Sequence, residues 1–121
     1  MIEIHVNTVR FKVTVKGHAL PEESEKYREI CSAVSALVQG LEYTLTKFES
    51  DHDPFKTTEW RPTPGDTVFR VWPEEWAMRS VRKRIETYAD GMELLALAHP
   101  GSVHMIRDGE EIKNFGGDEN E

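Results

Sequence analysis

The alternation of apolar residues at the start of this chain restricts its fold more than any other sequence feature. Apolar and polar residues alternate over residues 2–6 and again over residues 9–15, which is the pattern of strands with one buried face. The phase of the alternation changes across Asn7-Thr8, as a tight turn between paired strands requires. Residues 1–16 are therefore predicted to form an antiparallel β-hairpin.

From Tyr27 onward the apolar residues recur at spacings of three and four, which predicts a long amphipathic helix. Its apolar stripe consists of Tyr27, Ile30, Val34, Leu37, Leu41, Leu45 and Phe48. Residues 55–60 and 67–72 flank a proline- and glycine-rich turn and predict a second hairpin with many aromatic residues. These aromatic side chains indicate core or a subunit interface, and a peptide-binding groove is the alternative.

A second helix is predicted to begin at Pro73-Glu74-Glu75, because proline and acidic residues are favoured in a first helical turn. His99-Pro100-Gly101 ends it, and residues 102–107 have the pattern of a final strand. A basic cluster on the outward face of this helix is formed by Arg79, Arg82, Lys83 and Arg84. A solvated surface explains such a cluster most simply, and a site for an acidic or ribosomal partner is the alternative.

These elements follow the order ββαββαβ. Two amphipathic helices need one shared apolar surface, and five short strands can provide it. The predicted fold is therefore an α+β two-layer sandwich, in which two helices cover a mainly antiparallel five-stranded sheet. Residues 1–107 are expected to form a single domain, and the glycine- and acid-rich residues 108–121 are expected to form a disordered tail.

The charge of the chain is unevenly distributed. Of the net charge of −7, residues 108–121 contribute −5, so the expected domain carries only −2. Because no basic surface is evident from this balance, direct nucleic-acid binding is not expected. The first apolar run alternates with polar residues, so neither a signal peptide nor a membrane span is expected. The single cysteine, Cys31, excludes an internal disulfide and a multi-cysteine zinc site, and a free thiol fits a reduced, cytoplasmic setting.

His18 and Cys31 are the candidate reactive residues. His18 follows the second predicted strand, and Cys31 lies on the helix that comes next. Because a short connection folds such a helix back onto the sheet, the imidazole can reach the thiol and take its proton. Each residue also has a more ordinary interpretation. A lone cysteine in an apolar stripe is most often a small buried side chain, and a lone histidine at a strand end is most often a surface residue.

The residues around this pair resemble a known family. Gly17-His18-Ala19, followed by Cys31-Ser32-Ala33-Val34-Ser35-Ala36-Leu37, resembles the Prp (YsxB-like) family of ribosomal-processing cysteine proteases. The resemblance extends over roughly residues 1–107 and implies that His18 is the catalytic histidine, that Cys31 is the nucleophile and that Ser35 is the matching serine. It also implies a homodimer that removes a short N-terminal extension from a ribosomal protein precursor, or trims a phage virion protein. No cofactor and no metal are expected.

The oxyanion of such a reaction could be bound by backbone amides near Cys31 or by the hydroxyls of Ser32 and Ser35. Relatives carry a glycine and Asp-Ile-Val directly before the cysteine, whereas this chain has Tyr-Arg-Glu-Ile at residues 27–30. A catalytically silent homologue that acts as a dimeric protein-binding module is therefore the alternative function. An unrelated structural dimer with a core cysteine is a third possibility.

Residues 20–29 leave two local structures open. A mobile lid over residues 20–27, with the helix starting near Tyr27, would place Cys31 where the helix dipole stabilises a thiolate. A helix that starts at Pro21 would place Cys31 too deep in the helix for this effect. We predict the lid, whose many acidic residues suit a basic substrate.

Overall fold

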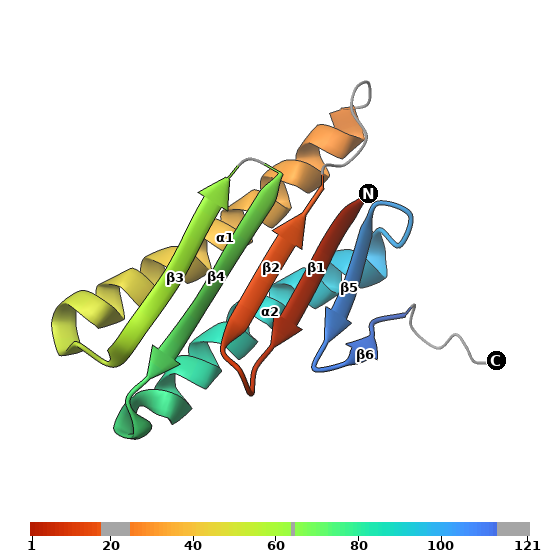
Figure 1. Ribbon diagram of the computed structural model, residues 1–121. Helices are drawn as coiled ribbons and strands as arrows, with labels where there is room; N and C mark the ends of the chain where they lie inside the picture. Colours follow the sequence, from red (N-terminus) through yellow and green to blue (C-terminus); the bar gives the residue numbers. More distant parts are fainter. Residues whose placement is uncertain (18–24, 64, 114–121) are drawn as a thin grey trace.

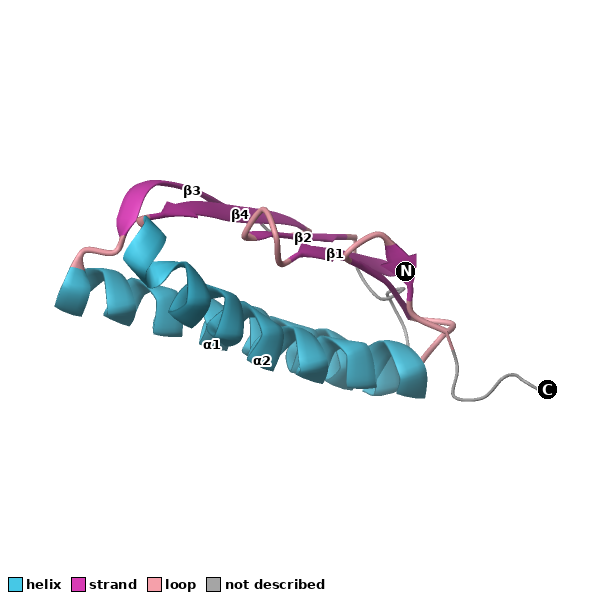
Figure 2. Ribbon diagram, turned by 90° about the horizontal axis from the view of Figure 1, so that it is seen from below, coloured by secondary structure: helices cyan, strands magenta, loops and turns pink. Residues whose placement is uncertain are grey.

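The structure, a computed structural model, describes residues 1–17, 25–63 and 65–113. Two helices, α1 and α2, pack side by side against one face of a single sheet, and the opposite face of the sheet is open in the described part of the chain (Figure 1, Figure 2). This arrangement confirms the predicted α+β two-layer sandwich and the ββαββαβ order, to which one further short strand is added at the end.

The strands of the sheet are β1 (Ile2–Asn7), β2 (Lys12–Lys16), β3 (Phe55–Thr63), β4 (Asp66–Pro73), β5 (Val103–Arg107) and β6 (Glu110–Glu111). Their order in space is β3-β4-β2-β1-β5-β6. Neighbouring strands are antiparallel except β1 and β5, which are parallel. The two hairpins are therefore joined edge to edge through β2 and β4, and this junction positions the candidate site described below.

The turn of the first hairpin is longer than the sequence predicted. It occupies the residues between β1 and β2 rather than Asn7-Thr8 alone. The side-chain oxygen of Asn7 accepts hydrogen bonds from the backbone N–H groups of Val9 (3.1 Å) and Arg10 (2.9 Å). Such local side-chain bonding stabilises turns in preference to strands. Val9 consequently lies in the turn and is exposed.

The helical segments are α1 (Glu25–His52), a single 3₁₀ turn η1 (Glu75–Ala77) and α2 (Met78–Ala98). The two long helices approach closely at glycines. A Cβ added at Gly40 would lie 2.6 Å from Cε1 of Tyr88, and one added at Gly91 would lie 2.9 Å from Cδ2 of Leu37. Within the described residues, no helix has the run of apolar side chains that a membrane span requires.

The apolar stripes of both helices and the inward-facing strand residues form one core. Its largest fully buried side chains include Ile4, Leu41, Leu45, Ile85, Met92 and Met105. Burying each aliphatic side chain of this size contributes about 1.5–3 kcal/mol to folding. The helix–sheet interface is therefore the main source of stability, as the periodic patterns predicted.

The predicted basic cluster does not face outward as a whole. The guanidinium carbon of Arg82 lies 4.9 Å from the ring centre of Phe11, and that of Arg84 lies 4.1 Å from the ring centre of Phe48. Both arginines flank the buried stripe of α2, so their long side chains can fold back over neighbouring aromatic rings. The other two members of the cluster are exposed, as predicted.

The structure orders part of the predicted disordered tail. Glu110–Glu111 pairs with β5, and Ile112 packs against the core. The carboxylate of Asp108 accepts hydrogen bonds from the backbone N–H (2.7 Å) and the hydroxyl (2.9 Å) of Thr8. These contacts anchor the turn before β6, so the sheet has six strands in its described part instead of the five predicted. Residues 114–121 lie outside the described residues.

Candidate active site

The end of β2 determines where the chain leaves the sheet toward the candidate site. Lys16 pairs with Asp66 at the start of β4, and the backbone N–H of Gly17 donates a hydrogen bond to the carbonyl oxygen of Gly65 (2.8 Å). Gly17 has a φ of +86°, and a Cβ at this position would overlap the carbonyl oxygen of Met1. Glycine meets both requirements, because it has no Cβ and adopts positive φ at little cost.

His18, the predicted catalytic histidine, lies outside the described residues, as do residues 20–24 of the predicted lid. The structure does describe the residue to which His18 is attached, since Gly17 is held at the sheet end by Gly65. The prediction that the His18 ring approaches the sulfur of Cys31 therefore stays a prediction.

Cys31 lies on α1, which begins at Glu25. The helix is described from Glu25 onward, so residues 25–27 are helical rather than part of the predicted lid, and Cys31 lies six residues beyond Glu25. The helix dipole and the unpaired N–H groups act mainly within the first turn. They therefore give little stabilisation to a thiolate at Cys31. The side chain is a free thiol that is partly exposed and packs against the edge of the core.

A cavity of about 280 Å³ lies between α1 and the adjoining ends of β1, β2 and the β3–β4 hairpin. Its lining residues are Ile2, Val15, Gly17, Cys31, Val34, Ser35, Val38, Gly65 and Thr67. Aliphatic side chains form much of the wall, and the thiol and two hydroxyls supply the polar groups. Small-ligand pockets usually measure about 300–1,000 Å³, so this cavity suits a short peptide segment better than a large ligand.

The two serines proposed as oxyanion donors differ in position. Ser35 lines the same cavity as Cys31, as expected for residues one helical turn apart. Its hydroxyl oxygen accepts a hydrogen bond from Nε2 of Gln39 at 3.4 Å. Ser32 is exposed and does not line this cavity. Of the two serines, the structure therefore brings Ser35 and not Ser32 into the cavity of the thiol.

Gly65 and Thr67 line the cavity, although the sequence analysis did not select them. The proline- and glycine-rich residues before Thr67 indicated a turn, but no local signal placed that turn beside Cys31. Its position follows from the pairing of β2 with β4, in which Val15 lies opposite Thr67. Strand pairing between separate hairpins is a long-range property, so a pattern-based analysis cannot locate this wall of the cavity.

The described part of the chain supplies thiol and hydroxyl chemistry at this site. Among residues 1–17, 25–63 and 65–113, no three or more His, Cys, Asp and Glu side chains are placed to bind a metal ion. A second cavity, of about 500 Å³, lies on α2 and is lined by none of the residues of the Cys31 cavity. The Cys31 cavity is therefore the candidate active site.

Comparison with known proteins identifies similar structures. No protein-family model matches the chain, and no curated protein matches it. The ribosomal processing protease Prp from S. aureus, in complex with a substrate peptide, is 11% identical with a TM-score of 0.67, covering 88% of this chain and 99% of that chain. The same protease with a covalently linked product peptide is 12% identical, with a TM-score of 0.63 and the same coverage.

A third similar structure is that of SMU.848 from Streptococcus mutans, which is 18% identical with a TM-score of 0.61 and covers 88% of this chain and 90% of that chain. At such low identity, similarity of structure establishes a common fold. The family resemblance noted around Gly17-His18-Ala19 and Cys31 is thus confirmed at the level of the fold. The chain has the fold of the ribosomal processing protease Prp.

Proposed function

We propose that this protein is a cysteine endopeptidase in which Cys31 is the nucleophile and His18 is the general base. The observation that carries this proposal is the cavity that contains Cys31, Ser35 and Gly17, the residue directly before His18. Because Gly17 lines the same cavity as the thiol, a histidine attached to it needs no long connection to reach Cys31. The fold shared with a protease of known activity supports the same reaction class.

In the proposed reaction His18 takes the proton from Cys31, and the thiolate attacks the carbonyl carbon of the scissile peptide bond. The carbon–nitrogen bond then breaks while His18 returns the proton to the leaving amine, which leaves a thioester on Cys31. His18 next deprotonates a water molecule that hydrolyses the thioester and releases the acid product. Proton transfer of this kind contributes roughly 10²–10⁴-fold to the rate.

The oxyanion formed at each step needs hydrogen-bond donors. Cys31 lies beyond the first four residues of α1, so its backbone N–H is already used within the helix. The hydroxyl of Ser35 remains available in the cavity. We assign Ser35 as the oxyanion donor, a role that is worth about 2.7–4 kcal/mol of transition-state stabilisation in related chemistry.

The substrate of the proposed protease is a peptide with an apolar side chain next to the scissile bond. Ile2, Val15, Val34 and Val38 line the cavity and favour such a side chain by excluding water. We propose the N-terminal extension of a ribosomal protein precursor, processed in the cytoplasm, as the substrate; a phage virion protein is the variant of this proposal. The support is the shared fold with a ribosomal processing protease.

The proposal is tested by incubating the purified protein with peptides that span the processing site of candidate ribosomal precursors, followed by intact-mass measurement. We expect one new N-terminus with the wild-type protein and none with Cys31→Ala or His18→Ala. Ser35→Ala should lower the rate about 10²–10³-fold. Ser32→Ala is the matched control, because Ser32 is exposed outside the cavity, and it should cleave at the wild-type rate. Cleavage that persists in Cys31→Ala would contradict the proposed nucleophile.

A catalytically silent, dimeric protein-binding module is the second candidate function. The observation that favours it is the depth of Cys31 in α1, where the helix dipole does little to stabilise a thiolate. In this case the wild-type protein would bind the same peptides without cleaving them, and Cys31→Ala would bind them with equal affinity. Isothermal titration calorimetry measures the peptide affinity of both proteins, and intact mass measures cleavage. Binding without cleavage would identify the binding module.

A further inference from the structure

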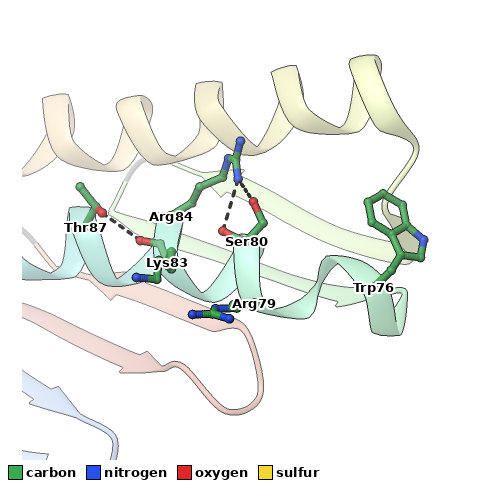
Figure 3. Close-up of a pocket in the computed structure, with 6 residues that line it drawn as sticks. All are labelled: Trp76, Arg79, Ser80, Lys83, Arg84 and Thr87. Carbon is green, nitrogen blue, oxygen red and sulfur yellow. Dashed lines mark hydrogen bonds between the residues drawn. The ribbon is translucent and has the colours of Figure 1, made fainter.

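A cavity larger than that of Cys31 forms a groove on the first half of α2. It has a volume of about 500 Å³ and is lined by Trp76, Arg79, Ser80, Lys83, Arg84 and Thr87, hereafter the basic groove. Figure 3 shows these side chains projecting from η1 and α2, with Arg84 extending toward α1. Three of the six carry a positive charge and none carries a negative charge, in a chain whose net charge is −7.

The positive charges of the basic groove are not neutralised by carboxylates of the described residues. Among the described residues, Arg61 and Arg107 form ion pairs with carboxylates. Arg79, Lys83 and Arg84 form no ion pair in this part of the chain. Elsewhere on the surface, Arg107 pairs with both Asp90 and Glu93. The basic groove therefore offers unpaired cations, which attract a ligand with several negative charges.

Arg84 is held in place within the groove although it has no acidic partner. Its guanidinium group lies over the ring of Phe48 and donates hydrogen bonds to the hydroxyl and the carbonyl oxygen of Ser80 (Figure 3). Thr87 similarly donates a hydrogen bond to the carbonyl oxygen of Lys83 (2.9 Å). A cation whose side chain is already ordered loses less entropy when an anion binds.

Trp76 adds an exposed aromatic surface at one end of the groove. The residue is 63% exposed, which is unusual for tryptophan. One edge is supported by Phe48, whose ring centre lies 6.4 Å away in an edge-to-face arrangement. An indole ring fixed on one side and open on the other can stack with a flat aromatic ligand.

We propose that the basic groove binds a short single-stranded segment of nucleic acid. Lys83, Arg79 and Arg84 would neutralise successive phosphates, and Trp76 would stack against a base. Aligned cations beside an aromatic ring are the combination by which proteins bind single strands without reading their sequence. An acidic peptide would use the cations but would leave the indole ring unused, so the structure favours a nucleotide chain. A local cluster of this kind is compatible with a negative net charge, because salt screens distant charges over about 8–10 Å.

This proposal is independent of the proposed protease activity. The basic groove and the Cys31 cavity share no lining residue, and they are built from different elements. A substitution in the basic groove can therefore abolish nucleic-acid binding and leave peptide cleavage intact. A substitution in the Cys31 cavity can abolish cleavage and leave nucleic-acid binding intact.

The test is the fluorescence anisotropy of a labelled single-stranded oligouridine of about ten nucleotides, titrated with the protein at low and moderate salt. With three phosphate contacts, the logarithm of the affinity should fall with the logarithm of the salt concentration with a slope of about −2. Lys83→Glu and Arg79→Glu should each weaken binding about tenfold and flatten this slope by about 0.7. Trp76→Leu, which keeps an apolar contact with Phe48, should weaken binding at least fivefold by removing the stacked base.

Lys12→Glu is the matched control, because it makes the same change of charge on β2, where Lys12 alternates with the buried Val13 and therefore faces away from the helices. Its affinity should equal that of the wild-type protein. The proposal is overturned if the wild-type protein fails to bind at low salt, or if Lys12→Glu weakens binding as much as Lys83→Glu. Equal affinity for a duplex of the same length would exclude stacking on Trp76. Binding of oligoaspartate as tight as that of oligouridine would instead identify a groove for acidic peptides.

Discussion

At the scale of single residues, the Cys31 thiol is distinguished by its surroundings rather than by its helix position. It lines a cavity with the Ser35 hydroxyl and with the glycine that precedes His18, while its place six residues beyond Glu25 in α1 gives it little help from the helix dipole. In the proposed protease, activation of the thiol therefore depends on His18. An active protease would therefore lose the reactivity of its thiol when His18 is replaced, whereas a catalytically silent relative would not.

The reactivity of Cys31 can be measured without knowing the substrate. Cys31 is the only cysteine in the chain, so alkylation adds a single mass that can be assigned without digestion. We expect iodoacetamide to modify the folded protein near neutral pH, and His18→Ala to slow the reaction by removing the base. The measurement is intact mass as a function of time. Labelling that occurs only after denaturation would show that Cys31 is a core residue.

Gly17 is the residue whose backbone angle most constrains the site. We expect Gly17→Ala to lower the free energy of unfolding by about 1–3 kcal/mol, since a Cβ is strained at positive φ and overlaps the carbonyl oxygen of Met1. Chemical denaturation measures this change. Gly109 has a similar φ of +85°, but a Cβ added there would meet no neighbouring atom. Gly109→Ala therefore measures the backbone strain without the steric overlap, and it should cost less than Gly17→Ala. Gly101→Ala, at ordinary φ and in open space, should be nearly neutral.

At the scale of elements, the contact between α1 and α2 depends on two glycines that face large side chains. Alanine is favoured over glycine in a helix by about 1 kcal/mol, but an added methyl group at either position meets Tyr88 or Leu37. The two effects have opposite signs. Their balance shows how tightly the helices pack.

We expect Gly40→Ala to destabilise the protein by about 1 kcal/mol, because overpacking against the Tyr88 ring costs about 1–3 kcal/mol and outweighs the gain in helix propensity. In the Tyr88→Ala background the ring is absent, and the same substitution should become stabilising. Urea denaturation of the four proteins forms a double-mutant cycle. The same sign in both backgrounds would show that the ring can move aside, and that the helix contact is loose.

The last strand is attached to the sheet by a histidine between two carboxylates. Nδ1 of His104 lies 2.8 Å from Oε1 of Glu3 on β1, and Nε2 lies 2.9 Å from Oε2 of Glu111 on β6. Hydrogen bonding to Glu3, and next to Glu111, raises the pKa of His104 above 6.5. Both ring nitrogens can donate a hydrogen bond only when the ring is protonated. The raised pKa favours the protonated ring, and the protonated ring is the form that joins β1, β5 and β6.

This arrangement predicts a pH dependence. A raised folded-state pKa stabilises the protein below pH 6.5, and the stabilisation is lost as the pH rises through that pKa. Hydrogen exchange of the β6 amides should therefore be slower at about pH 6 than at about pH 8, after correction for intrinsic exchange. His104→Gln should remove the difference. His5→Gln, whose histidine is exposed and lies 3.8 Å from Glu3, should retain it.

At the scale of the whole molecule, the two layers leave the outer face of the sheet open in the described part of the chain (Figure 2). The Cys31 cavity and the basic groove lie on different elements of the fold. One cavity offers a thiol for covalent chemistry, and the other offers unpaired cations for binding. Large apolar side chains also remain exposed on the helices, including Tyr43 and Leu94. A molecule with these surfaces can accommodate more than one partner.

The resemblance to Prp predicts that the protein is a homodimer. Light scattering coupled to size exclusion should therefore give about twice the 13.9 kDa mass of one chain. A stable dimer of this kind buries about 800 Å² per chain, so the mass should hold as the protein is diluted to micromolar concentration. A mass of one chain at every concentration would contradict the prediction.

The sequence by itself determined the fold class and the order of the elements up to β5. Alternation over residues 2–6 and three- and four-residue spacing over α1 and α2 are local patterns, and each specifies which face of its element must be buried. Because two amphipathic helices and a one-sided sheet have few ways to bury those faces together, the two-layer sandwich followed. The predicted pairing of His18 with Cys31 rests on the family resemblance around residues 17–19 and 31–37. The shared fold supports that resemblance, and the pairing itself stays a prediction.

Only the tertiary structure decided which distant residues meet. The β2–β4 pairing brings Gly65 and Thr67 to the wall of the Cys31 cavity, and the contact of Asp108 with Thr8 orders a strand where a disordered tail was expected. The direction of Arg84, folded over Phe48 on α1, likewise depends on how two helices lie together. Such contacts join positions far apart in the chain, and their geometry is set by packing of the whole core rather than by any local pattern.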